Sequence, residues 1–113
     1  MQVQVTTGHR VEGSQRLIQH VEDEVTAALE RFGNRITRVE VHFTDENGHT
    51  KSTGTDKRCA VEARLAGLPP LAVSHQAATL EQALGGAIEK LERSLDHTLG
   101  RLKDGRLREL PRP

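Results

Sequence analysis

The segment from Thr79 to Leu95 has the sequence TLEQALGGAIEKLERSL and largely determines the architecture of the chain. Thr79 followed by Gln82 is a capping-box pattern, typical of a helix N-terminus, because the threonine side chain can accept a hydrogen bond from the Gln82 amide. Apolar residues then recur at steps of three and four, which places them on one face of a helix. They are Leu80, Ala83, Leu84, Ala87, Ile88, Leu91, Leu95, Leu99 and, at the end of the stripe, Leu102. The segment therefore predicts a long helix with one buried face.

Two glycines, Gly85 and Gly86, interrupt this helical pattern. A glycine inside a helix costs roughly 1 kcal/mol relative to alanine. We therefore expect close backbone packing of the helix on a sheet or on another helix. The pair lies in mid-helix and not at a strand-to-helix turn, so it is not a phosphate-binding glycine loop.

Upstream of this helix, four segments alternate apolar and polar residues, the period of a half-buried strand. They are Gln2–Thr7, Arg35–Phe43, Lys57–Leu65 and Leu71–His75. A first helix is predicted after the N-cap Ser14, with its end at Gly33-Asn34. A polar loop containing Asn47-Gly48 joins the second and third strands.

The predicted order is β-α-β-β-β-α, an α+β fold with a four-stranded sheet and two helices packed on one of its faces. A chain of 113 residues forms one domain of this kind. We assign it to residues 1–104, followed by a flexible basic C-terminal tail over residues 105–113. The other face of the sheet is expected to be polar and open.

The composition restricts how the chain can bind nucleic acid. It has two phenylalanines, Phe32 and Phe43, and no tyrosine or tryptophan, so readout by base stacking is not expected. Formal net charge is zero but uneven: residues 1–89 hold nine Lys/Arg and twelve Asp/Glu, and residues 90–113 hold seven and four. Any RNA binding would depend on charge and shape, at the C-terminal end.

No pattern of catalytic or metal-binding residues is present. The six histidines (His9, His20, His42, His49, His75 and His97) show no H-x-H or H-E-x-x-H spacing, so we expect no metal. Cys59 falls on the inward face of its strand and is expected to be a buried thiol. With no P-loop and no nucleophile motif, we expect no enzyme, no cofactor and no small-molecule substrate. No apolar run approaches the ~20 residues of a membrane span, and no signal peptide is evident, which favours the cytoplasm.

Basic residues occur on the polar face of the C-terminal helix, at Lys90, Arg93, Arg101 and Lys103. One interpretation is a solvated face, offset by nearby Glu89, Glu92 and Asp96. The other is a set of contacts to RNA phosphates. The pattern alone leaves both open.

Three stretches resemble the ribosome hibernation-promoting factors and ribosome-associated inhibitors, also called sigma-factor modulation or ribosomal-interface proteins. They are Val3–Thr6 followed by Glu12, Leu29–Ile36, and above all Ala83–Leu95, which is similar to the family's Ala-Ile-Asp-x-x-Ile-Asp-Lys-Leu-x-Arg-Gln-Leu helix. The resemblance covers roughly residues 2–104. The chain is similar to the short members, which lack a C-terminal ribosome-pairing domain.

This resemblance implies a fold similar to a double-stranded-RNA-binding domain and no catalysis. It also implies binding to 16S rRNA of the small ribosomal subunit, where tRNA and mRNA would lie, with inhibition of translation and ribosome hibernation under stress. By position, the RNA-binding residues would be Lys90, Arg93, Arg101, Lys103 and, at the second strand, Arg35. The first helix departs from the family, with Glu22-Asp23-Glu24 where lysines are usual.

An alternative function is a protein-interaction or dimerisation module on the same fold that has lost ribosome binding. It would self-associate or dock through an open sheet edge or the polar sheet face. The two hypotheses differ in the salt dependence of RNA association, which is steep in the first and absent in the second.

Overall fold

The computed structural model describes residues 1–8, 11–45 and 57–109, with side chains described as far as Arg101. The elements are β1 (Gln2–Thr7), α1 (Gln15–Leu29), the 3₁₀ helix η1 (Glu30–Arg35), β2 (Ile36–Asp45), β3 (Lys57–Leu65), β4 (Leu71–Ala77) and α2 (Leu80–Glu109). The predicted order β-α-β-β-β-α is confirmed. The predicted turn at Asn47-Gly48 lies outside the described residues.

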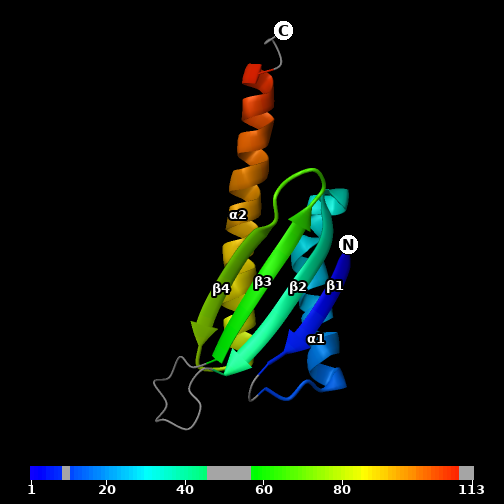
Figure 1. The fold of residues 1–113 in the computed structure, drawn as a ribbon, viewed down its shortest axis with the longest axis vertical. Helices are drawn as coiled ribbons and strands as arrows, with labels where there is room; N and C mark the ends of the chain where they lie inside the picture. Colours follow the sequence, from blue (N-terminus) through cyan, green and yellow to red (C-terminus); the bar gives the residue numbers. More distant parts are fainter. Residues whose placement is uncertain (9–10, 46–56, 110–113) are drawn as a thin grey trace.

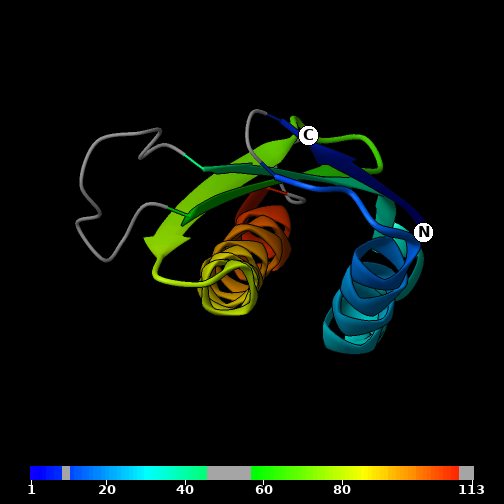
Figure 2. The same cartoon turned by 90° about the horizontal axis from the view of Figure 1, so that it is seen from below.

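The four strands form one mixed sheet in the order β1-β2-β3-β4, in which β1 is parallel to β2 and the other neighbours are antiparallel. Both helices cover the same face of this sheet (Figures 1 and 2). The register places Val41 beside Val5 on one side and Val61 on the other. Apolar residues therefore share the face under the helices, and the α+β fold class is confirmed.

The core lies between this sheet face and the two helices. On the strands, its central residues are Val39, Val41 and Phe43 of β2, and Cys59, Val61 and Ala63 of β3. The helices supply Val21, Val25, Leu29, Ala83, Leu84, Ala87, Ile88, Leu91, Leu95 and Leu99. In the part of the chain that the structure describes, no polar or charged residue is buried. The polar side chains are thus left to the surfaces, where a binding site would be formed.

Both predicted helix caps are present. The Ser14 hydroxyl accepts a hydrogen bond from the Leu17 amide at 3.1 Å, and the Thr79 hydroxyl accepts one from the Gln82 amide at 3.1 Å. Each bond satisfies one of the amides that a helix N-terminus leaves without a partner. Local sequence therefore fixes where both helices begin.

Element ends differ in places from the prediction. The α-helical part of the first helix ends at Leu29, and η1 continues it to Arg35. Within η1, Gly33 has a φ of 62°, a left-handed conformation that glycine adopts without strain. β4 extends to Ala77, past the predicted end at His75, because Ala77 still pairs with Lys57 of β3.

The C-terminal helix is longer than the sequence predicted. It continues past Asp104 to Glu109, and its last turns project beyond the sheet (Figure 1). The residues after Asp104 are mostly good helix formers, and the single Gly105 costs only about 1 kcal/mol. The division into a domain of residues 1–104 and a flexible tail stays a prediction.

The glycine pair in α2 has two different surroundings. A Cβ atom added at Gly86 would lie 2.1 Å from Cδ2 of His75 on β4, whereas one added at Gly85 would meet nothing within 4 Å. The close approach predicted for the pair is therefore confirmed at Gly86 only. It brings the backbone of α2 against the ring of His75.

Cys59 is fully buried, and burial raises the pKa of its thiol from 9.0 to about 12. Between these two values the unfolded chain loses the proton and the folded chain keeps it. The free energy of unfolding should therefore fall as the pH rises through this window. Because the thiolate is the reactive species, we expect native protein at pH 8 to react with Ellman's reagent far more slowly than denatured protein. Equal rates would show that the thiol is accessible.

Candidate nucleic-acid interface

The basic side chains of α2 form one line on its solvent side, here called the basic strip: Lys90, Arg93, His97 and Arg101. All four are exposed. Residues three and four apart are neighbours on a helix surface, so the steps in this set align them. At a rise of 1.5 Å per residue, the basic strip extends over roughly 16 Å. Its length suits several consecutive phosphates of an RNA backbone.

The acidic side chains of α2 form a separate line, the acidic strip, made of Glu89, Glu92 and Asp96. Each is one position before a residue of the basic strip, which rotates it by about 100° around the helix axis. Arg31 of η1 donates two hydrogen bonds to the Asp96 carboxylate, at 3.0 and 3.1 Å. These bonds hold the pKa of Asp96 below its usual value, and they raise the pKa of Arg31, to which Glu92 also contributes. Asp96 and Glu92 of the acidic strip thus act on η1 and not on the basic strip.

Arg31 is held in this position from a second side. Its guanidinium carbon lies 4.1 Å from the centre of the Phe32 ring, which is cation–π distance. Arg31 therefore joins η1 to α2, with its guanidinium engaged by both Asp96 and Phe32. Sequence analysis missed this pair, since the partners are 65 residues apart.

Lys90 lies on the β4 side of α2. Its ammonium donates a hydrogen bond to the backbone carbonyl of Ser74 at 2.9 Å. Since β4 is an edge strand, this bond occupies one backbone acceptor of the sheet edge. An ammonium has three donors, so two remain for a phosphate.

Among the described residues, no carboxylate lies within ion-pair distance of Lys90, Arg93 or Arg101. Arg35 is also exposed, at the end of η1, where its carbonyl accepts a hydrogen bond from the Ala66 amide at 2.9 Å. The structure therefore brings three of the five predicted residues into one strip. It places Arg35 on the segment that Arg31 ties to α2. Lys103 belongs to α2, but its side chain is outside the described part.

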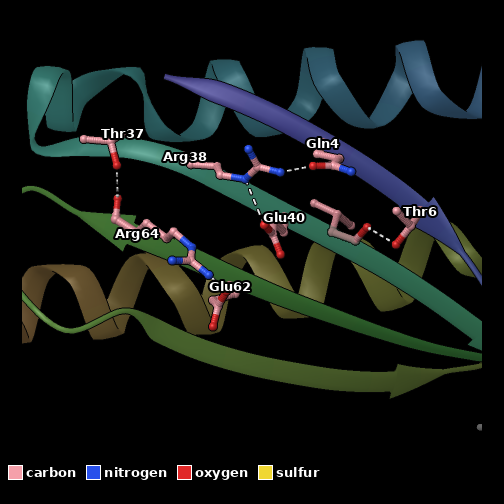
Figure 3. A network of polar contacts seen from close by, with 8 residues as sticks. Gln4, Thr6, Thr37, Arg38, Glu40, Glu62 and Arg64 are labelled. Carbon is pink, nitrogen blue, oxygen red and sulfur yellow. Dashed lines mark hydrogen bonds and ion pairs between the residues drawn. The ribbon is translucent and has the colours of Figure 1, made fainter.

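The opposite face of the sheet is polar, as predicted, and its charges are paired with one another (Figure 3). Arg38 binds Glu40 at 2.8 Å and also contacts Gln4, and Arg64 lies 3.5 Å from Glu62. These pairs leave little uncompensated positive charge there. Between the two faces, the one with the basic strip is the better candidate for an RNA backbone.

A family model described as "Sigma 54 modulation protein / S30EA ribosomal protein" matches residues 4–103. The chain belongs to this family. The S30EA family consists of ribosome-binding factors without enzymatic activity, so both the predicted resemblance and the expectation that the protein is no enzyme are confirmed. A search of curated proteins found no match.

Solved structures agree with the S30EA assignment at the level of fold. The Thermus thermophilus Protein Y N-terminal domain is 19% identical, with a TM-score of 0.69 over 87% of this chain and 99% of that one. A ribosomal subunit interface protein from Coxiella burnetii is 14% identical, with a TM-score of 0.68 over 88% of this chain and 99% of that one. In the described part of the chain, no helix is long and apolar enough to cross a membrane.

Proposed function

We propose that this protein binds the small ribosomal subunit, in the cytoplasm, through 16S rRNA in the region where tRNA and mRNA lie. Bound there, it inhibits translation and keeps idle ribosomes in hibernation under stress. The contacts are made to rRNA phosphates by Lys90, Arg93, Arg101, Lys103 and Arg35.

The observation that supports this proposal best is the separation of charge around α2. A chain with sixteen basic and sixteen acidic residues would bind RNA weakly if each basic side chain were paired with an acidic one. Here Arg31 engages Asp96 on the side facing η1, and Arg93 and Arg101 have no acidic partner in the described structure. An RNA phosphate can therefore approach them without displacing an internal ion pair.

The side chains available at the surface determine how the protein can contact RNA. Both phenylalanines are buried and the chain has no tyrosine or tryptophan, so no benzene or indole ring is exposed for base stacking. Arginine and lysine contacts to phosphates release counterions and are insensitive to base sequence. The structure thus favours recognition of folded RNA by its backbone, which suits structured rRNA.

The surface available to RNA is narrower than the combined solvent-facing surface of α1 and α2. Asp23 is exposed on α1, with Glu22 and Glu24 half-exposed beside it. These carboxylates would repel a phosphate backbone. We therefore expect RNA to follow the basic strip of α2 and to avoid the first half of α1.

A displacement experiment tests the proposed location. Small subunits saturated with the protein should bind much less initiator tRNA than free subunits, and the loss should be reversed by salt that releases the protein. The effect should match inhibition of a cell-free translation reaction. If the protein stays bound while tRNA binding is unchanged, the proposed location is wrong. If the protein does not bind at all, the interaction-module hypothesis becomes the better one.

A further inference from the structure

Three side chains that can ligate a metal converge at the end of the helix layer where both helices begin. His20 and Glu24 are one turn apart on α1, and Glu81 lies in the first turn of α2. The Nε2 atom of His20 is 3.4 Å from a Glu24 carboxylate oxygen and 3.9 Å from one of Glu81. All three ligand atoms lie within 4.8 Å of one another.

The topology explains this convergence. β1 and β4 run in the same direction, so the helices that follow them both start at the same end of the sheet and run alongside it (Figures 1 and 2). The first turn of α2 therefore comes next to the first half of α1. Glu81 is placed there by the Thr79 cap, which fixes the start of α2.

The negative charge of the two carboxylates in the cluster is not neutralised by a lysine or an arginine. In the described part of the chain, neither Glu24 nor Glu81 has a lysine or arginine within ion-pair distance, and the basic group nearest to both is the His20 imidazole, which carries charge only when protonated. Two carboxylates thus point at one imidazole nitrogen. A cation bound between them would neutralise this charge, as it does at protein metal sites generally.

We propose that His20, Glu24 and Glu81 form a surface site for a divalent zinc ion. Zinc binds histidine nitrogen and carboxylate oxygen at about 2.0–2.2 Å in tetrahedral geometry, so its ligand atoms lie roughly 3.4 Å apart. The distances at His20 are already close to this value. Because all three side chains reach solvent, water can fill the fourth position. Magnesium and calcium prefer six or more oxygen ligands, so this set with one nitrogen selects against them.

The site is separate from the proposed RNA contacts, because it lies at the first turn of α2 and the basic strip begins at Lys90. It would fasten α1 to α2 at that end. Sequence spacing gave no signature for it, since one ligand comes from a different helix.

Isothermal titration of the untagged full chain with zinc chloride tests the proposal. We expect one equivalent to bind, and His20→Ala and Glu81→Gln each to weaken binding by more than the roughly 10-fold that loss of an outer-shell partner costs. His97→Ala removes an exposed histidine outside the cluster and should leave binding unchanged. Zinc should also raise the melting temperature of the parent but not of His20→Ala.

Circular dichroism of each variant verifies folding, and Glu81→Gln keeps the shape of an exposed side chain, so a loss of binding is not a loss of structure. The proposal is overturned if the parent binds no zinc up to about 1 mM. It is equally overturned if His20→Ala and Glu81→Gln bind zinc as the parent does, because the ion would then lie elsewhere.

Discussion

Gly86→Ala is expected to destabilise the protein by about 1–3 kcal/mol, whereas Gly85→Ala is expected to stabilise it by up to about 1 kcal/mol. Both changes remove a helical glycine and gain the same helix propensity. Only at Gly86 does the new Cβ meet a neighbour, the His75 ring at 2.1 Å, so the ring or the helix must move. Urea denaturation of the two variants measures the difference.

A double variant identifies the cause. His75→Ala removes the ring that the new methyl would meet, so Gly86→Ala should become stabilising in that background. The coupling between the two positions follows from the double-mutant cycle. If Gly86→Ala is as stable as Gly85→Ala in the parent, α2 does not approach β4 as closely as the structure has it.

Reversing two charges of the basic strip is expected to lower affinity for small subunits by roughly a hundredfold or more, since charged hydrogen bonds contribute about 1.5–3 kcal/mol each. The variant is Lys90→Glu with Arg93→Glu. The dependence of log affinity on log salt should also become shallower by about 2, because two phosphate contacts are lost. Sedimentation with isolated subunits measures both.

The matched control is Arg16→Glu with Arg64→Glu, which changes net charge by the same amount. Arg16 is exposed at the start of α1, and Arg64 is on the outer sheet face. This variant should lose little affinity, and its salt dependence should stay that of the parent. Equal losses in the two variants would mean that net charge matters and the basic strip does not.

Much of the fold was predictable because its signals are local. The alternation in Lys57–Leu65 defines β3 to the residue, and Ser14 and Thr79 begin the helices where the capping pattern predicts. The ends of elements were less predictable. The extension of β4 depends on pairing with β3, and sequence pattern does not report pairing.

The surface contacts were not predictable for a related reason. Arg31 with Asp96, Lys90 with Ser74, and His20 with Glu81 each join residues distant in the chain. Hydrophobic periodicity places each charged residue of these pairs on an exposed face, but it does not indicate a partner. The bonds from Arg31 to Asp96 leave Arg93 and Arg101 without an acidic partner among the described residues, which favours RNA contacts over a solvated face without deciding between them. The assignment of Lys90, Arg93, Arg101, Lys103 and Arg35 to RNA stays a prediction.

Under the proposed function, rRNA phosphates hold the protein through about five cations. We would measure co-sedimentation of the unaltered protein with small ribosomal subunits between about 50 and 300 mM salt. We expect the protein to be retained at low salt, and the logarithm of its association constant to fall with the logarithm of the salt concentration with a slope of roughly −4. The affinity should therefore drop by about a thousandfold across the range. Retention that does not change with salt, or no retention at the lowest salt, would show that phosphate contacts do not hold the protein on the subunit.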